Sequence, residues 1–370
     1  MSLLETLATE VGVRMAGSPE AERAAEAVAA ALRDLGLEPR FQEFHLLGYD
    51  PDEPELEIAG ERWEAGPCMY AHPTDGVVEG CIRHIGQTSL GEFFPRAHVF
   101  AVEDESARDL ARLQASPFGG PAIPFVAGAR QIAVGPTAFI SGADALRLLR
   151  MEGAVARVRV GGRFVPGRRD RNVVAELRGE SDEAIVVSAH FDSVWRGPGA
   201  IDNATGIEAL LRVARRLVGR RHPHSVLFCA FAAEEIGMLG ARHFVYEAGI
   251  TGELQRIRGV VNLDCVAHGR RLELLGSPAE LRTRAQELAR DLGLTERYRV
   301  QVEYTKAGLD SVPFAEEGVP ALSIVHFPYP EYHLPSERLE LVDERRLADS
   351  VDLAVALVES QLEQPVARAA

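Results

Sequence analysis

The chain has 370 residues, 46% of them hydrophobic, and a formal net charge of −15. That length allows a catalytic domain with a large core and a second, smaller domain. A pI near 5.3 and the lack of a basic run argue against nucleic acid and anionic membranes as partners. No stretch reaches the ~20 apolar residues of a membrane span, and the start lacks the basic and apolar segments of a signal peptide, so we expect a cytoplasmic protein.

The first predicted elements are a helix and a strand. Apolar residues recur at helical spacing from Ser18 to Leu35, with Ser18 as the cap and Gly36 as the stop. A strand over Arg40–Leu46 follows the helix. These two elements would begin the catalytic domain.

Residues 48–167 differ in texture from the rest of the chain. Proline and glycine are frequent there and apolar runs are short, apart from a helical pattern over Ser141–Met151 and an alternating pattern over Val155–Val160. We interpret residues 48–167 as a small β-rich domain. It would be inserted into a catalytic domain made of residues 1–47 and 168–370.

After Arg171, apolar strands alternate with amphipathic helices. The predicted strands are Val173–Leu177, Ala184–Ala189, Val226–Phe231, Gly259–Asp264 and Ala321–Val325. The predicted helices are Thr205–Val218, Leu239–Ala248, Ala279–Leu292 and Glu344–Leu362. This alternation predicts the α/β class, with a mixed, largely parallel sheet covered by helices on both faces.

Histidine and acidic residues follow several of these strands. His190 and Asp192 come at the end of one strand, Glu234 and Glu235 follow the next clear one, and Asp264 ends a third. Because open α/β sheets place their sites outside the carboxyl ends of the strands, these side chains should converge on one edge.

Two further candidate ligands lie in turns. Asp202 falls within the glycine-containing turn Gly197–Gly206, just ahead of a helix, and His333 falls within the proline-rich segment Pro328–Pro335. Carboxylates mixed with neutral imidazoles suit zinc, with cobalt or manganese as replacements in vitro. Such ligands on separate strand ends are what a two-metal hydrolase needs.

The motifs that carry these residues resemble, in order, those of the co-catalytic dizinc aminopeptidases. They are His190-Phe191-Asp192-Ser193, Gly199-Ala200-Ile201-Asp202-Asn203-Ala204-Thr205-Gly206, Ala233-Glu234-Glu235-Ile236-Gly237, Asn262-Leu263-Asp264 and Tyr332-His333. That family includes bacterial leucyl aminopeptidases and aminopeptidase Y, and it is related to the glutamate carboxypeptidases. The inserted region resembles a protease-associated domain loosely, which implies a lid or specificity domain.

The resemblance implies two zinc ions and a ligand set. Asp202 would bridge the two ions. His190 and Asp264 would complete one site, and Glu235 and His333 would complete the other.

It also implies the roles of the surrounding residues. Glu234 would be the general base, and Tyr332 would stabilise the tetrahedral oxyanion. Asp192 would orient the His190 imidazole. The peptide bond between Asp202 and Asn203 would be cis, as in similar enzymes.

Three residues are candidates for substrate binding. Lys306, the single lysine of the chain, stands where some relatives place an arginine that contacts substrate. Asp310 precedes Ser311-Val312-Pro313-Phe314, whereas relatives commonly show Ser-Asp-His or Ser-Asp-Tyr before Pro-Phe. His326 lies close to His333 in the sequence and would line the substrate pocket.

The leading hypothesis is a metal-dependent aminopeptidase that acts on peptides with a free N-terminus. A dizinc carboxypeptidase or small-amide hydrolase on the same scaffold is the alternative, and a catalytically inactive binding protein is the alternative of another class. A full ligand set together with Glu234 argues against the inactive protein, and an acidic site edge favours a substrate ammonium. The sequence is compatible with an oligomer.

Overall fold

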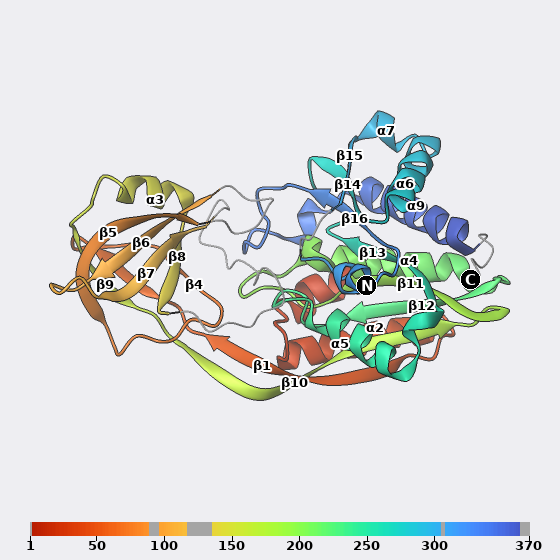
Figure 1. Ribbon diagram of the computed structural model, residues 1–370, viewed down its shortest axis with the longest axis horizontal. Coiled ribbons are helices and arrows are strands. Elements are labelled where there is room, and N and C mark those ends of the chain that lie inside the picture. The colour runs from red at the N-terminus through yellow and green to blue at the C-terminus, as the bar shows by residue number, and fades with distance from the viewer. Residues whose placement is uncertain (1, 89–95, 117–134, 305–307, 363–370) are drawn as a thin grey trace.

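The computed structural model describes residues 2–88, 96–116, 135–304 and 308–362. Two bodies are visible in Figure 1: a main body built on one sheet with helices around it, and a smaller body built on a second sheet. Two long strands, β1 (Arg40–Pro51) and β10 (Gly162–Leu177), run side by side from the first toward the second.

The main sheet contains eight strands within the described residues. Their spatial order is β1, β10, β12 (His224–Phe231), β11 (Ser181–His190), β13 (Ile257–Asp264), β16 (Ala321–Phe327), β14 (Arg271–Ser277) and β15 (Arg299–Glu303). The four central strands β12, β11, β13 and β16 are parallel. Strand β10 is antiparallel to both β1 and β12, and β14 is antiparallel to β16 but parallel to β15. The predicted mixed, largely parallel sheet is therefore confirmed, and four carboxyl ends meet at one edge.

Helices cover both faces of this sheet, because the central strands are apolar on both sides. In β11, Ile185 and Val187 belong to one core with α2, α4, α6 and α9, while Ala184 and Val186 belong to the opposite core with α5 and α8. These helices are α2 (Pro19–Asp34), α4 (Thr205–Leu217), α5 (Leu239–Thr251), α6 (Ala279–Asp291), α8 (Val312–Glu316) and α9 (Glu344–Leu362). Shorter helical segments are α1 (Leu3–Glu5), η1 (Thr6–Val11), η2 (Ala200–Ala204), η3 (Leu254–Arg256), α7 (Leu294–Arg297) and η4 (Leu339–Leu341).

The second sheet lies between β1 and β10 in the sequence and has its own core of buried residues. Its spatial order is β3 (Glu61–Arg62), β2 (Glu55–Ile58), β9 (Val155–Arg159), β5 (Val78–Thr88), β6 (Ala97–Glu103), β7 (Asp109–Ala115), β8 (Thr137–Ile140) and β4 (Gly66–Pro67), with α3 (Gly142–Leu148) packed on it. Strands β1 and β10 each run across a predicted boundary of the 48–167 insertion, so neither boundary coincides with the end of an element. The boundaries therefore stay a prediction.

Local sequence signals explain where helix α2 begins, and they explain less well where some strands begin and end. The Ser18 hydroxyl accepts a hydrogen bond from the Ala21 N–H at 3.1 Å, with Pro19 in the first turn, as the predicted cap requires. The predicted strand at Arg40 runs on to Pro51, beyond Leu46. Strands β14 and β15 were not predicted, because charged residues interrupt their apolar patterns: Arg271 and Glu273 lie at the start of β14, and Arg299 and Glu303 begin and end β15.

A buried aspartate on β10 provides a test of this packing. The N–H groups of Gly17 and Arg171 donate to the Asp170 carboxyl at 2.6 and 2.8 Å, yet burial raises the pKa of Asp170 to about 7. Its ordinary value is 3.8. The folded state therefore binds this proton more tightly than the unfolded state, and the resulting stability is lost as the pH rises through about 7.

We expect Asp170→Asn to remove this pH dependence. The difference between the free energies of unfolding of wild type and variant should change by up to about 1.4 kcal/mol per pH unit in the window between the two pKa values. Urea unfolding curves collected across that window measure it. Stabilities of the two proteins that run parallel with pH would contradict the interpretation.

Candidate metal centre

The predicted ligands meet at the carboxyl edge of the four parallel strands. His190 is the last residue of β11 and Asp264 the last of β13, while Glu235 follows the end of β12 and His333 follows the end of β16. Asp202 lies in η2, between β11 and α4. All five side chains are buried, with at most 5% of each residue exposed.

The Asp202 carboxylate lies between the two histidines. Its Oδ1 is 3.1 Å from His190 Nε2, and its Oδ2 is 3.3 Å from His333 Nε2. His190 Nε2 is also 3.6 Å from Asp264 Oδ1, and His333 Nε2 is 3.2 Å from Glu235 Oε2. The side chains thus form two groups that share Asp202.

The electrostatics of these groups are those of a cation site. Burial alone would lower the pKa values of His190 and His333, but the facing carboxylates raise both well above the usual range. Burial raises the pKa of Glu235 to about 7, with His333 opposing the shift. Glu235 Oε1 and Asp264 Oδ1 are buried and accept no hydrogen bond from any described residue. Oxygen atoms left in this way fit coordination to a metal ion.

Comparison with known proteins identifies the family of the chain. Residues 172–358 match peptidase family M28. The chain belongs to peptidase family M28. Aminopeptidase YwaD of Bacillus subtilis is 26% identical over 96% of this chain and 83% of its own length. Aminopeptidase Y of Saccharomyces cerevisiae is 28% identical over 43% of this chain and 30% of its own length.

Solved structures share the fold of this M28 peptidase. BSAP, a zinc aminopeptidase from Bacillus subtilis, superposes with a TM-score of 0.74 at 21% identity, covering 98% of this chain and 94% of that one. A peptidase M28 precursor from Shewanella amazonensis gives a TM-score of 0.77 at 18% identity, covering 98% and 93%. Both cover the second sheet as well as the main body.

Asp192 supports the site in more than the predicted way. Its Oδ1 lies 3.5 Å from His190 Nδ1, which is the expected contact with the imidazole. The two carboxylate oxygens also accept hydrogen bonds from the N–H groups of Glu234 and Glu235, at 3.0 and 3.2 Å. One fully buried carboxylate therefore ties the end of β11 to the turn after β12.

The turn before Asp202 is held by an arginine that sequence reasoning missed. Arg14 is fully buried, and its guanidinium donates to the carbonyl oxygens of Phe191, Pro198 and Gly199. Gly199 has φ +57°, and a Cβ there would lie 2.3 Å from the Asp202 carbonyl oxygen, so only glycine fits. The one available signal was a charged residue within the apolar stretch around Arg14.

Asn203 fixes the other side of the same turn. Its Nδ2 donates to the Leu263 carbonyl at 2.9 Å, and its Oδ1 accepts from the N–H groups of Gly206 and Cys265. The peptide bond between Asp202 and Asn203 is cis, as the resemblance implied.

Several residues at this edge have left-handed backbone conformations without being glycine. Ala233, Cys265 and His333 have φ values of 56°, 50° and 60°. Such conformations are uncommon for residues with a Cβ and concentrate at functional sites. His333 is itself a predicted ligand, Ala233 directly precedes the predicted base Glu234, and Cys265 directly follows the predicted ligand Asp264.

The other predicted residues fall in different places. The Tyr332 ring stacks on His333 with centroids 3.9 Å apart. Asp310 is fully buried, and neither of its carboxyl oxygens has a hydrogen-bond partner among the described residues. His326 is buried too, with its ring against Tyr298 and its Nδ1 3.3 Å from Arg346 Nη1. Lys306 lies outside the described residues.

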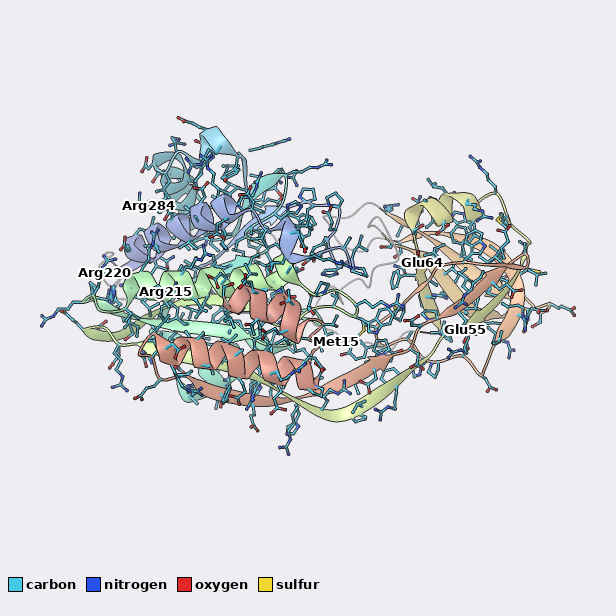
Figure 2. The ribbon with its side chains drawn as sticks, turned by 180° about the vertical axis from the view of Figure 1, so that it is seen from behind. Met15, Glu55, Glu64, Arg215, Arg220 and Arg284 are labelled. Carbon is cyan, nitrogen blue, oxygen red and sulfur yellow. The ribbon has the colours of Figure 1, made fainter. Side chains whose placement is uncertain are left out.

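A small, mostly apolar pocket opens beside Glu235. Its lining residues come from the main body, including β1, and from the segment after β4. Met15, labelled in Figure 2, is on the side of the main body that faces the second sheet. Its lining residues are Met15, Ala16, Gly48, Tyr49, Met69, Tyr70, Ser193, Val194, Trp195, Glu235 and Ile236. Among the residues that the structure describes, Glu235 is the one charged side chain that lines the pocket.

We expect Asp192→Asn to lower turnover by 10–100-fold, because an amide cannot accept both N–H bonds that the carboxylate accepts. Steady-state kinetics with a peptide substrate measure the loss. Asp349→Asn is the matched control, since Asp349 is a buried aspartate that pairs with Arg297 and Tyr298 instead. Equal activity of the two variants would contradict the role given to Asp192.

Proposed function

We propose that this M28 peptidase is a zinc-dependent aminopeptidase whose five ligands hold two metal ions. Asp202 is the shared ligand, with His190 and Asp264 on one side and with Glu235 and His333 on the other. The observation that carries this proposal is the position of the Asp202 carboxylate, since its two oxygens face two different imidazoles at 3.1 and 3.3 Å.

The donor set fits zinc, because it combines imidazole nitrogens with carboxylate oxygens. Three carboxylates bring three negative charges against four positive charges on two divalent ions. When bound, such a pair supplies Lewis acidity toward a peptide carbonyl and toward the attacking water.

Glu234 is the proposed general base. It takes a proton from the attacking water and gives it to the leaving amine nitrogen. Burial, together with Asp310 and Glu235, raises the pKa of Glu234 well above the usual range, while His190 opposes the shift. A carboxylate in such surroundings can hold the transferred proton between the two steps. Asp192 fixes the backbone of Glu234, so the base has a defined position.

The remaining proposed roles concern the substrate. The Tyr332 hydroxyl stabilises the oxyanion of the tetrahedral intermediate. The substrate ammonium is attracted by the buried carboxylates at this edge, and Asp310 adds to their field. Lys306 and His326 stay as predicted substrate-binding residues. The apolar lining of the pocket beside Glu235 favours peptides with an apolar side chain near the scissile bond.

The alternative activities fit these surroundings less well. A carboxypeptidase needs a cation for the substrate carboxylate, whereas the buried Arg14 donates to backbone carbonyl oxygens. An inactive binding protein has no need of Glu234, and the relatives named above are described as aminopeptidases.

For the location of the protein, we propose the cytoplasm. None of the helices in the described ranges is long and apolar enough to cross a membrane. One relative is named for a different location: the probable lipoprotein aminopeptidase LpqL of Mycobacterium tuberculosis is 25% identical over 69% of this chain and 55% of its own length. Fractionation of the source cells tests the location directly.

We expect Glu234→Gln to keep its metal and lose most of its turnover. The amide cannot accept a proton, while Glu235 still ligates, and the loss of a general base typically costs ~10²–10⁴-fold. Metal analysis and kcat, measured on the same sample, test both halves of this statement. A near-normal kcat, or loss of metal from the variant, would refute the assignment.

The aminopeptidase activity itself is tested by a pair of substrates. We expect the zinc-loaded protein to hydrolyse an aminoacyl anilide with an apolar side chain and to leave the N-acetylated form of the same compound intact. Chelator-treated protein should be inactive and should recover with zinc. Cleavage of both compounds at similar rates would favour the amide hydrolase instead.

A further inference from the structure

Glu337 is a buried glutamate that neither the sequence motifs nor the proposed ligand set includes. It lies four residues after His333, in the segment between β16 and η4, and is 1% exposed. Burying a carboxylate is costly unless it is paired, so its partners need to be identified.

Both oxygens of Glu337 bind the loops that carry metal ligands. Oε1 accepts hydrogen bonds from the N–H groups of Ile201 and Asp202, at 3.1 and 2.7 Å. Oε2 accepts from the N–H of His333 at 3.3 Å and from the Tyr329 hydroxyl at 3.1 Å. A single carboxylate thus joins the loop of the shared ligand to the loop of a terminal ligand.

These hydrogen bonds indicate that Glu337 is not itself one of the metal ligands. Each of its oxygens is already occupied by two donors. Glu337 is a buried carboxylate beside the buried carboxylate of Asp202, and like charges at close range are electrostatically unfavourable. An apolar side chain would avoid that cost but would leave three backbone N–H groups without this acceptor.

The two proposed metal sites depend on Glu337 to different extents. His190 and Asp264 end neighbouring strands β11 and β13, which are paired in parallel along their length. Their separation is therefore set by the sheet. His333 lies beyond the end of β16, in a loop where the left-handed backbone at φ 60° also needs support. The position of His333 relative to Asp202 has no strand pairing to fix it.

We propose that Glu337 is a positioning residue that holds His333 against the shared ligand Asp202, and so sets the zinc affinity of the site that His333 forms with Glu235. This inference rests on the proposed two-metal function. It adds a selective prediction: weakening Glu337 should affect one of the two metal ions and leave the other in place.

The test is zinc titration of metal-free wild type and Glu337→Gln. The amide oxygen can keep the bonds to Ile201 and Asp202, but the amide nitrogen cannot accept from the His333 N–H. We expect wild type to bind two zinc ions tightly, and the variant to bind one ion with unchanged affinity and the other 10–100-fold more weakly. Saturating zinc should restore the activity of the variant.

Glu273→Gln is the matched control. Glu273 is also 1% exposed and pairs with Arg271 at 2.7 Å on β14. The same chemical change there should leave both zinc affinities as in wild type, because Glu273 pairs with Arg271 of its own strand and not with a loop that carries a proposed ligand. Circular dichroism of the metal-free proteins checks that each variant is folded.

The outcomes separate the two levels of the argument. A single zinc ion on wild type would overturn the proposed two-metal function, whatever the variant does. Two zinc ions on both proteins with equal affinities, or an equal loss at both sites, would overturn the role of Glu337 alone. If Glu337→Gln does not fold, Tyr329→Phe removes one of the four donors, and a smaller loss at the same single site is then the expected result. Unchanged titration of that variant would overturn the proposal.

Discussion

The whole arrangement depends on the concentration of negative charge around Asp202. Asp202 is buried within reach of both Glu235 and Asp264, where carboxylates repel strongly because the local dielectric is low. Two imidazoles offset part of this repulsion. Cations would offset the rest, which would couple the folding of this edge to metal binding. The neighbouring turns hold like charges at close range, and this constraint explains why so many buried polar groups surround them.

The buried charged side chains that hold the turns of the site fall into two kinds. One kind binds backbone carbonyl oxygens and the other binds backbone N–H groups. Arg14 takes the carbonyl oxygens before Asp202, and Glu337 takes the N–H groups at Asp202 itself. Asp192 similarly takes the N–H groups at Glu234 and Glu235. Each turn is thus oriented by a fully buried charge whose partners are main-chain groups. Side chains of the ligands remain available, because the scaffold does not compete for them.

The sequence predicted the parts of this protein that local patterns encode. Buried parallel strands such as β11 read as continuous apolar runs, and a ligand such as His190 is recognisable because it ends one. Strand β14 escaped prediction because Arg271 and Glu273 interrupt the apolar pattern at its start. Arg14 and Glu337 escaped because the partners that tie them to the loop of Asp202 are backbone groups more than a hundred residues away, and no local pattern marks such pairs. The left-handed conformation of Ala233 is equally invisible, since alanine does not favour it.

The paired strands β1 and β10 have a consequence for the modularity of the chain. Their register continues to Pro51 opposite Gly162, so the chain leaves the main body and returns to it at adjacent points. A shorter protein could join these strands by a tight turn and keep the main sheet in register. The second sheet can therefore be gained, lost or exchanged during evolution without moving any of the strand ends that carry the proposed ligands. Structural diversity among proteins with this main body is therefore expected to concentrate beyond the paired ends of β1 and β10, at Pro51 and Gly162.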